Sequence, residues 1–450
     1  MNLAARALAL ALLPTLLSIA LGATSPASAA EAASDATASD SLESPNVTRI
    51  DVTGHHVTKE YVIRREIETK PGAPFRPETV GADVVRLENL GIFSSIQATA
   101  TNDTTGVALD YHVREMPWII PALAASYTEQ NGWSFGPAVS SLNLAGRDIS
   151  LSGKVLFGGA STFSMTFSYP WITGNHLGID AHAAKLVRED DLNEFEERST
   201  EITPQIGTYL GRRGRLRGIY SYFRIRSDVD GKTLSSDNLD HLHRLGVALG
   251  YDSRNSYRDP TEGWWMEAVA AHTGGGFLGG EGDFWTTVLD VRRFQPGPWR
   301  HSIHVGGLFS DQTGQVGVDV PTYLQYRLGG ANTIRGHDID VLGKQLYGTK
   351  QLLLTAEYQV PVVDLREVRI LGAAFSMGLK AALFADQGIA WTDGEQFGAE
   401  RSRSGVGAGL RILLPGVDVL RLDIAYGEGE GFRFHLAGRP KMVSQRGRVR

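Results

Sequence analysis

Residues 404–427 read SGVGAGLRILLPGVDVLRLDIAYG, in which apolar side chains alternate with small or polar ones on both sides of Pro415 and Gly416. A period of two places successive side chains on opposite faces of a β-strand. Proline followed by glycine favours a tight turn. The stretch therefore predicts two antiparallel strands, 402–414 and 418–427, joined by a short turn.

The same alternation extends outward from this stretch through the C-terminal part of the chain. From Trp118 onward no segment has helical spacing, and turn residues separate the alternating segments. The segments number sixteen, and a closed single-chain outer-membrane barrel needs an even number of strands. We expect strands at 119–128, 133–144, 148–158, 161–170, 176–188, 199–211, 214–227, 240–254, 262–274, 281–294, 299–311, 350–361, 376–391, 402–414, 418–427 and 431–437.

The connections between these segments alternate between short and long. Polar stretches at 187–199, 227–240 and 311–348 are long, whereas those at 143–148, 212–214 and 295–298 are short. Membrane barrels have short periplasmic turns and longer external loops. A soluble β-sandwich or propeller is the alternative, but neither gives a reason to separate long and short connections so regularly. The fold class indicated is a membrane β-barrel of 16 antiparallel strands.

The N-terminal residues have the features of an export signal. Arg6 precedes an apolar run that ends at Leu21, and Ala27-Ser28-Ala29 resembles a cleavage site. We expect a signal peptide at 1–29 and a disordered linker at 30–45, since the linker has almost nothing to bury. A membrane anchor is the alternative for the first segment, but Pro14 interrupts a run that is too short to span.

Composition excludes several classes of protein. The chain has no cysteine, so an exported protein of this length uses no disulfides. A net charge of −6 does not suggest a nucleic-acid partner. After the signal, no apolar run is long enough for a membrane helix, and the chain carries 52 glycines, 17 Phe, 14 Tyr and 8 Trp. Helical membrane proteins are therefore excluded.

Residues 46–117 form a small mixed α+β module in this interpretation. VTRIDVTG at 47–54 alternates as a strand, and TKEYVIRREIETKPG at 58–72 shows helical spacing that Thr58 could cap. A second helix starts at Pro77, a favourable first-turn residue. Two alternating strands follow at 94–102 and 106–117. The predicted order is β-α-α-β-β.

One loop and one strand carry unusual charges. The loop LGGANTIRGHDID, residues 328–340, holds Arg335, and the strand ALFADQGIAW, residues 382–391, holds Asp386 alone among apolar neighbours. A charge at membrane depth is costly unless it meets a partner, so the two make sense together if the loop folds into the barrel. The alternative is a solvated loop arginine and an ordinary lumen-facing aspartate.

Several motifs in order carry a family resemblance. The β-α-α-β-β module resembles a POTRA domain, and the barrel resembles the BamA, TamA and FhaC superfamily of outer-membrane assembly and translocation proteins. The matching stretches are SSLNLAGRDISLSG (140–153), MTFSYPWITGN (165–175), YDSRNSYRDPTEGWWMEA (251–268), LGGANTIRGHDID (328–340), TAEYQVPV (355–362), LFADQGIAW (383–391) and SGVGAGLRILLPGVDVLRLDIAYG (404–427). The resulting domains are a POTRA domain at 46–117, a barrel at 118–437 and a basic tail at 438–450.

The resemblance implies a lumenal lock. The loop arginine, Arg335, would dock against Asp386 of the F-x-D-x-G strand, with Glu357 as a second carboxylate. Arginine suits this role because its planar fork engages carboxylates in a fixed geometry. Gly336 would let the loop approach the wall. The remaining motif residues are Gly329, Gly330, His337, Phe384 and Gly388, and His337 departs from the Phe or Tyr usual in the family.

The resemblance also implies a function. The protein would be an outer-membrane insertion or translocation factor of a Gram-negative bacterium, with its POTRA domain in the periplasm and no cofactor, metal or catalytic residue. Its partners would be client polypeptides, either outer-membrane or secreted proteins, together with outer-membrane lipids and periplasmic accessory proteins. Clients would add a strand to the module and pass through the lumen or through the seam between the first and last strands. The last strand, GFRFHLAG at 431–438, is short, so this seam should hold few hydrogen bonds.

Three other functions remain as alternatives: a passive porin-like channel, a lipid transporter and a barrel enzyme. A porin has no need of the module at 46–117. For an enzyme, His241 with His243, or His301 with His304, come nearest to a ligand cluster, but no third ligand is evident. No G-x-S-x-G elbow and no P-loop occurs in the sequence.

Overall fold

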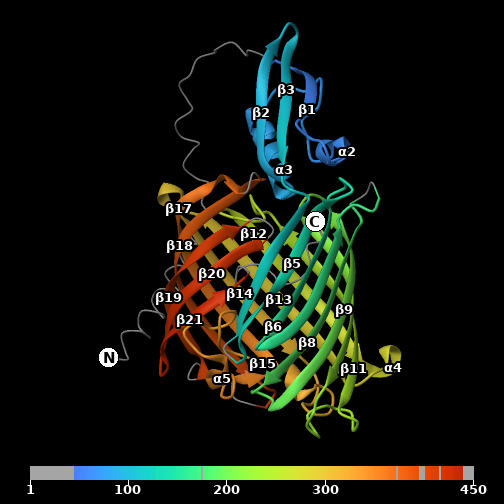
Figure 1. The fold of residues 1–450 in the computed structure, drawn as a ribbon, viewed down its shortest axis with the longest axis vertical. Coiled ribbons are helices and arrows are strands. Elements are labelled where there is room, and N and C mark those ends of the chain that lie inside the picture. Colours follow the sequence, from blue (N-terminus) through green and yellow to red (C-terminus); the bar gives the residue numbers. More distant parts are fainter. Residues whose placement is uncertain are drawn as a thin grey trace, which may run out of the picture.

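The protein consists of a small α+β module above a β-barrel (Figure 1). The computed structural model describes residues 45–128, 130–173, 176–370, 373–394, 401–414 and 417–438. The predicted signal peptide, the linker up to residue 44 and the basic tail beyond Gly438 lie outside the described residues. None of the helices in the described part is long and apolar enough to cross a membrane.

The module has the predicted β-α-α-β-β order. Its elements are β1 (Val47–Thr53), α2 (Glu60–Arg64), α3 (Pro77–Asn89), β2 (Phe93–Asp103) and β3 (Gly106–Glu115). The sheet order is β1-β3-β2, with β1 parallel and β2 antiparallel to the central β3. This order leaves β1 and β2 as the two edges of the sheet.

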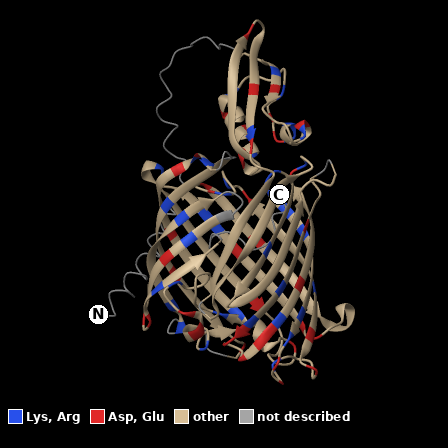
Figure 2. Ribbon diagram, viewed as in Figure 1, with Lys and Arg blue, Asp and Glu red and all other residues tan. Residues whose placement is uncertain are grey.

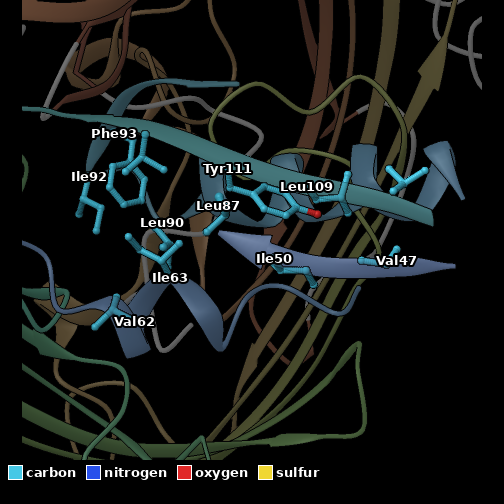
Figure 3. Close-up of a cluster of buried hydrophobic side chains, with 12 residues drawn as sticks. Val47, Ile50, Val62, Ile63, Leu87, Leu90, Ile92, Phe93, Leu109 and Tyr111 are labelled. Carbon is cyan, nitrogen blue, oxygen red and sulfur yellow. The ribbon is translucent and has the colours of Figure 1, made fainter. Parts of the chain in front are cut away.

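The module has its own hydrophobic core between the helices and the sheet (Figure 3). The alternating residues of β3, among them Leu109 and Tyr111, point into it together with Leu87 of α3. A buried polar group fastens α3: Asp83 accepts hydrogen bonds from the Tyr111 hydroxyl at 2.8 Å and from the Glu68 backbone N–H at 2.8 Å. A buried carboxylate is tolerated because its oxygens are occupied in this way.

The first helix differs from its prediction. It spans only Glu60–Arg64, because the N–H groups of Glu68 and Thr69 bond to Asp83 instead of continuing the helix. Thr58 is not the cap: Lys59 is the N-cap residue and its side chain makes no capping bond. The Thr58 hydroxyl instead accepts a hydrogen bond from a barrel side chain, Asn143 Nδ2, at 2.8 Å.

The barrel has the sixteen antiparallel strands that the sequence predicts, each joined to its neighbours in chain order. Among the described residues, the first strand, β4, and the last, β21, share no backbone ladder, so the barrel is nearly but not fully closed. The strands are β4 (Ile119–Thr128), β5 (Gly132–Leu144), β6 (Ile149–Gly158), β7 (Ala160–Tyr169), β8 (Gly178–Asp190), β9 (Phe195–Leu210), β10 (Gly214–Arg226), β11 (Leu239–Asp252), β12 (Gly263–Gly274), β13 (Asp283–Pro296), β14 (Ser302–Gln312), β17 (Lys350–Ile370), β18 (Ala373–Trp391), β19 (Arg403–Leu414), β20 (Val417–Gly427) and β21 (Gly431–Ala437).

Two connections differ from the predicted pattern. The outer stretch 187–199 is mostly strand, because β8 and β9 continue into it and leave a turn between Asp190 and Phe195. At the other rim, β17 continues nine residues past the predicted end at 361. Pro361 suggested an end, but register shifts between Pro361 and Arg366 absorb the residue that cannot donate to the ladder.

The long connection between β14 and β17 folds inward. It contains a two-stranded ribbon, β15 (Tyr326–Arg327) with β16 (Tyr347–Gly348), and a short helix, α5 (Ile339–Leu342). The apolar side chains Leu328, Ile334, Leu342 and Leu346 of this loop cluster with Leu353 of the barrel wall. Charged positions lie at both rims and along the strands of the C-terminal part of the barrel (Figure 2).

The module contacts one rim of the barrel, mainly through polar groups from several of its elements. The extended end of β17 takes part, because Glu367 forms an ion pair with Arg114 of β3 at 2.7 Å. These contacts place the module over one end of the barrel (Figure 1). Further contacts include the Lys59 N–H with the Gly146 carbonyl at 2.8 Å, Arg65 with Asp148 at 3.2 Å, the Tyr257 N–H with Asn89 Oδ1 at 2.9 Å, and Arg212 with Glu68.

Candidate functional site

The loop that carries the arginine is held in a compact form by its own polar groups. The Gly329 N–H donates to Thr333 Oγ1 at 2.7 Å, and the Thr333 hydroxyl donates back to the Gly329 carbonyl at 2.6 Å. The Gly330 N–H donates to the carbonyl of His337 at 2.7 Å. These bonds close the segment between Gly330 and His337, so that Arg335 stands at the end of a small ring of backbone.

Arg335 is fully buried and contacts Asp386 of β18 through both ends of its fork. Its Nε donates to Asp386 Oδ2 at 2.7 Å and its Nη2 to Oδ1 at 3.0 Å. The Arg335 backbone N–H also donates to Oδ2, at 3.1 Å. Thr355 of β17 adds a hydroxyl bond to Oδ1 at 2.5 Å. The carboxylate thus fixes both the side chain and the backbone of the loop.

The third guanidinium nitrogen reaches two more carboxylates. Arg335 Nη1 lies 3.1 Å from Glu357 Oε2 on β17 and 3.2 Å from Asp423 Oδ2 on β20. Arg411 of β19 bridges the same two acids, at 2.7 Å from Glu357 and 2.5 Å from Asp423. Arg421 lies 3.5 Å from Asp423. Three arginines therefore face three carboxylates, and the buried charges balance.

An aromatic ring supports the guanidinium from the side. The Arg335 guanidinium carbon lies 3.4 Å from the centre of the Phe384 ring, the geometry of a cation–π contact. Gly388, two residues past Asp386 on β18, leaves room for Ile334 of the loop, since a Cβ at Gly388 would stand 3.0 Å from Ile334 Cδ1. The strand motif thus supplies the carboxylate of Asp386, the ring of Phe384 and, at Gly388, the space that the loop occupies.

Gly336 brings the loop against the last two strands. Its φ is +92°, and a Cβ there would lie 2.5 Å from the carbonyl carbon of Tyr426 on β20, so only glycine fits. The Gly336 N–H donates to Nε2 of His435 on β21 at 2.9 Å. The loop is therefore bonded directly to the strand that borders the seam.

His337 holds the tip of the loop through polar contacts on both sides of its ring. Its Nδ1 lies 3.0 Å from Glu430 Oε1 in the β20–β21 turn, and its Nε2 lies 3.0 Å from the Ser404 carbonyl. Both partners are oxygen acceptors, and each faces one ring nitrogen. Glu430 also accepts from the Asp338 N–H at 2.8 Å. The loop tip is thereby held by the turn next to the seam.

The structure brings Arg335, Asp386 and Glu357 together, and it adds residues that the sequence reasoning missed. Arg411, Arg421 and Asp423 were overlooked, although each is a charge at an alternating position of a strand with apolar neighbours. That is the signal by which Asp386 stood out, and the same criterion applied to 402–414 and 418–427 would have found them. Thr355 carried no such signal.

The histidine pairs considered for metal binding have other partners. His241 and His243 bond through Nδ1 to the hydroxyls of Tyr222 and Tyr220, each at 2.8 Å. His304 is buried beside the Ser302 hydroxyl at 3.0 Å. Within the part of the chain that the structure describes, no group of three or more His, Asp or Glu side chains has metal-binding geometry.

Comparisons with known proteins agree with this architecture. Two relatives are both described as outer membrane protein assembly factor BamA: that of Nitratidesulfovibrio vulgaris is 22% identical over 401 residues, and that of Neisseria meningitidis serogroup B is 23% identical over 407. The aligned regions cover 85% and 78% of this chain but 48% and 47% of those proteins. The chain thus spans about half the length of these relatives.

Solved structures share the fold. BamA from Haemophilus ducreyi lacking POTRA domains 1-3 superposes with a TM-score of 0.55 at 15% identity, covering 87% of this chain and 83% of that one. CdiB from Acinetobacter baumannii gives 0.52 at 14% identity, covering 87% and 73%. Residues 45–116 match the POTRA family described as surface antigen variable number repeat. The chain lies in the outer membrane of a Gram-negative bacterium, with its POTRA domain in the periplasm. Since residues 143–439 match the Omp85 superfamily domain, the chain belongs to the Omp85 superfamily.

Proposed function

We propose that this Omp85 protein delivers client polypeptides into or across the outer membrane, and that it does so without covalent chemistry. The observation that carries the proposal is the position of the buried ion cluster. Arg335 ties an inward-folded loop to carboxylates on β17, β18 and β20, and Arg411 of β19 pairs with two of the same carboxylates. Gly336 ties the loop to β21 at the seam. A loop held in this way can control whether the last strand stays in place.

The POTRA domain would recruit the client by strand addition. Its sheet order leaves β1 and β2 as edges, and an edge strand offers unpaired backbone groups to an extended peptide. The outer half of β2, from Ala98 to Asp103, is mostly exposed. Because the other end of β2 contacts the barrel rim, where Ser94 bonds to Glu367 of β17, a client strand paired along β2 would extend toward the barrel.

The seam is the route that the geometry favours. The lumen holds the folded loop, whereas β4 and β21 lack a ladder within the described residues and β21 is only seven residues long. A client strand could pair with either free edge at low cost, because no native ladder must be broken first. A passive channel is less well supported, since it needs neither a locked loop nor a recruiting domain.

Depletion of the protein tests this proposal. Cells depleted of the chain should lose a defined set of proteins from the outer-membrane or secreted proteome, and the identity of that set separates insertion from secretion. Complementation with the Arg335→Ala variant should fail to restore the same set. Unchanged proteomes combined with altered small-solute uptake would favour a channel, and unchanged proteomes with altered lipid distribution would favour a lipid transporter.

A further inference from the structure

The outer wall of strands β8 to β11 carries basic side chains just beyond its apolar surface. The register identifies the outward face: Ile202 of β9 is 47% exposed and lies opposite Ala183 of β8 and Tyr222 of β10. Tyr222 in turn lies opposite His243 of β11. Side chains in line with this row, two residues along each strand, point outward as well.

The next outward row toward the external rim holds one lysine, one threonine, one arginine and one histidine. Lys185 of β8 lies opposite Thr200 of β9, which lies opposite Arg224 of β10, which lies opposite His241 of β11. One row farther out, Arg198 of β9 lies directly opposite Arg226 of β10. We call Lys185, Arg198, Arg224 and Arg226 the outer basic patch, and all four are exposed.

The fold itself gives these charges little compensation. Arg198 pairs with Glu196 on its own strand, whereas within the described residues Lys185, Arg224 and Arg226 have no ion pair. Like charges directly opposite each other on neighbouring strands destabilise the pairing, so Arg198 beside Arg226 is unfavourable unless an anion lies between them. One row beyond the patch, Glu189 lies opposite Glu196, and at the end of the basic row Glu281 accepts a hydrogen bond from the His241 N–H.

The patch lies at the height of the lipid head groups. From it toward the periplasm the outward residues are mostly apolar, and several are about half exposed, as expected of a lipid-facing band. Tyr220 and Tyr222 mark the edge of this band, where membrane barrels carry aromatic girdles. Lysine and arginine at that edge extend their apolar stems along the wall and place their charges among the head groups. The outward apolar residues are Ile202, Ile206, Leu210, Leu245, Val247 and Leu249.

We propose that the outer basic patch binds the phosphate of an anionic lipid head group in the external leaflet. Arginine forks match phosphate oxygens in a bidentate geometry, and Arg224 and Arg226 share one strand and one face. The acyl chains of the lipid would lie on the apolar band directly below. The site lies outside the lumenal ion cluster, so lipid binding there is separate from the lock and from the proposed delivery of clients.

The test measures lipid retention by the full-length protein. Native mass spectrometry of the detergent-solubilised chain compares added phosphatidic acid, whose head group is a phosphate monoester, with phosphatidylcholine. Each basic side chain near a membrane surface adds about 5-fold to the binding of an anionic lipid, so Lys185→Gln with Arg224→Gln should weaken phosphatidic acid binding roughly 30-fold. A control variant, Arg49→Gln with Lys70→Gln, removes two charges from the periplasmic module.

The proposal predicts that the wild type and the control variant prefer phosphatidic acid, and that the patch variant loses the preference. Equal retention of both lipids by the wild type would overturn it, as would an unchanged preference in the patch variant. Displacement of phosphatidic acid by inorganic phosphate at a similar concentration would also overturn it, since the site would then take a free anion in place of a lipid.

Discussion

At the scale of single residues, the buried ion cluster explains why the loop needs an arginine. Asp386 receives two side-chain bonds and one backbone bond from Arg335, and the ring of Phe384 lies against the same guanidinium. Removing one member of a buried pair costs on the order of 3–5 kcal/mol, because an unpaired charge is left behind. Any water in the lumen would reduce that cost.

Arg335→Lys tests the importance of the fork. Lysine keeps the charge but loses the bidentate geometry and the stacking on Phe384, so we expect the loop to be less firmly held, by about 1–3 kcal/mol. Protease accessibility of residues 328–340 in the folded barrel measures this. Arg433→Lys is the matched control, because its ion pairs are long, at 3.5 and 3.8 Å. Equal protection of the loop in both variants would argue against a role for the fork.

The stability of residues 55–58, at the junction of the two domains, should depend on pH through the carboxylate of Glu115. Its carboxylate accepts hydrogen bonds from the N–H groups of His56, Val57 and Thr58. Partial burial raises the pKa of Glu115, but the bonds from Thr58, Val57 and His56 outweigh it and hold the pKa below its ordinary value of 4.5. A lowered pKa contributes stability above 4.5, and this is lost as the pH falls through the folded-state value.

Glu115→Gln should therefore loosen residues 55–58 at neutral pH, and its difference from the wild type should shrink at acidic pH. Hydrogen exchange of these amides, corrected for the intrinsic rate at each pH, measures the effect in the full-length protein. A difference that stays constant between neutral pH and pH values well below 4.5 would show that the charge of Glu115 is not responsible.

At the scale of elements, the loop, β20 and β21 form one connected unit. Gly336→Ala should displace the loop tip from β20, because the new methyl group would meet the Tyr426 backbone. Gly211→Ala is the matched control: Gly211 also has a positive φ, but a Cβ added there would have no atom within 4 Å.

A positive φ alone costs about 1 kcal/mol for alanine, so any larger loss of stability in Gly336→Ala reports the clash. Urea unfolding of the purified barrel compares the two variants, and equal losses would mean that the loop tip does not press on β20.

The sequence predicted the strands well where a period of two, apolar residues alternating with polar ones, runs along the whole strand. All sixteen barrel strands were found, because outward apolar residues alternate with inward polar ones along each strand. It failed where tertiary contacts override local signals. Pro361 suggested the end of β17, yet the strand continues and its Glu367 contacts the module. Thr58 suggested a helix cap, yet its hydroxyl is bonded to Asn143 of the barrel.

The candidate site was predictable only in part. Arg335 and Asp386 stood out as charges in apolar or glycine-rich surroundings. The contacts of Arg411 and Asp423 depend on how far neighbouring strands are staggered, and sequence alternation alone does not give that stagger. The bond from Gly336 to His435 joins a loop to a strand 99 residues away, which no local pattern encodes.

At the scale of the whole molecule, the proposed function gives the POTRA domain and the barrel separate roles. The domain has its own core and meets the barrel mainly through polar rim contacts, with Leu142 of β5 as an apolar contact to that core. Deleting residues 46–117 should leave a heat-modifiable barrel in the outer membrane and abolish client delivery. Membrane levels of the truncated protein serve as the control, and full delivery by the truncated barrel would refute a recruiting role.

The most direct test of the central claim is a double-mutant cycle on Arg335 and Asp386, read out as client delivery and as conductance of the purified barrel. Each alanine change alone breaks the same contact, so the double variant should be less than additively impaired, with a coupling of about 1–3 kcal/mol. Strict additivity of Arg335→Ala and Asp386→Ala would contradict the account, because the two residues would then not act as a pair.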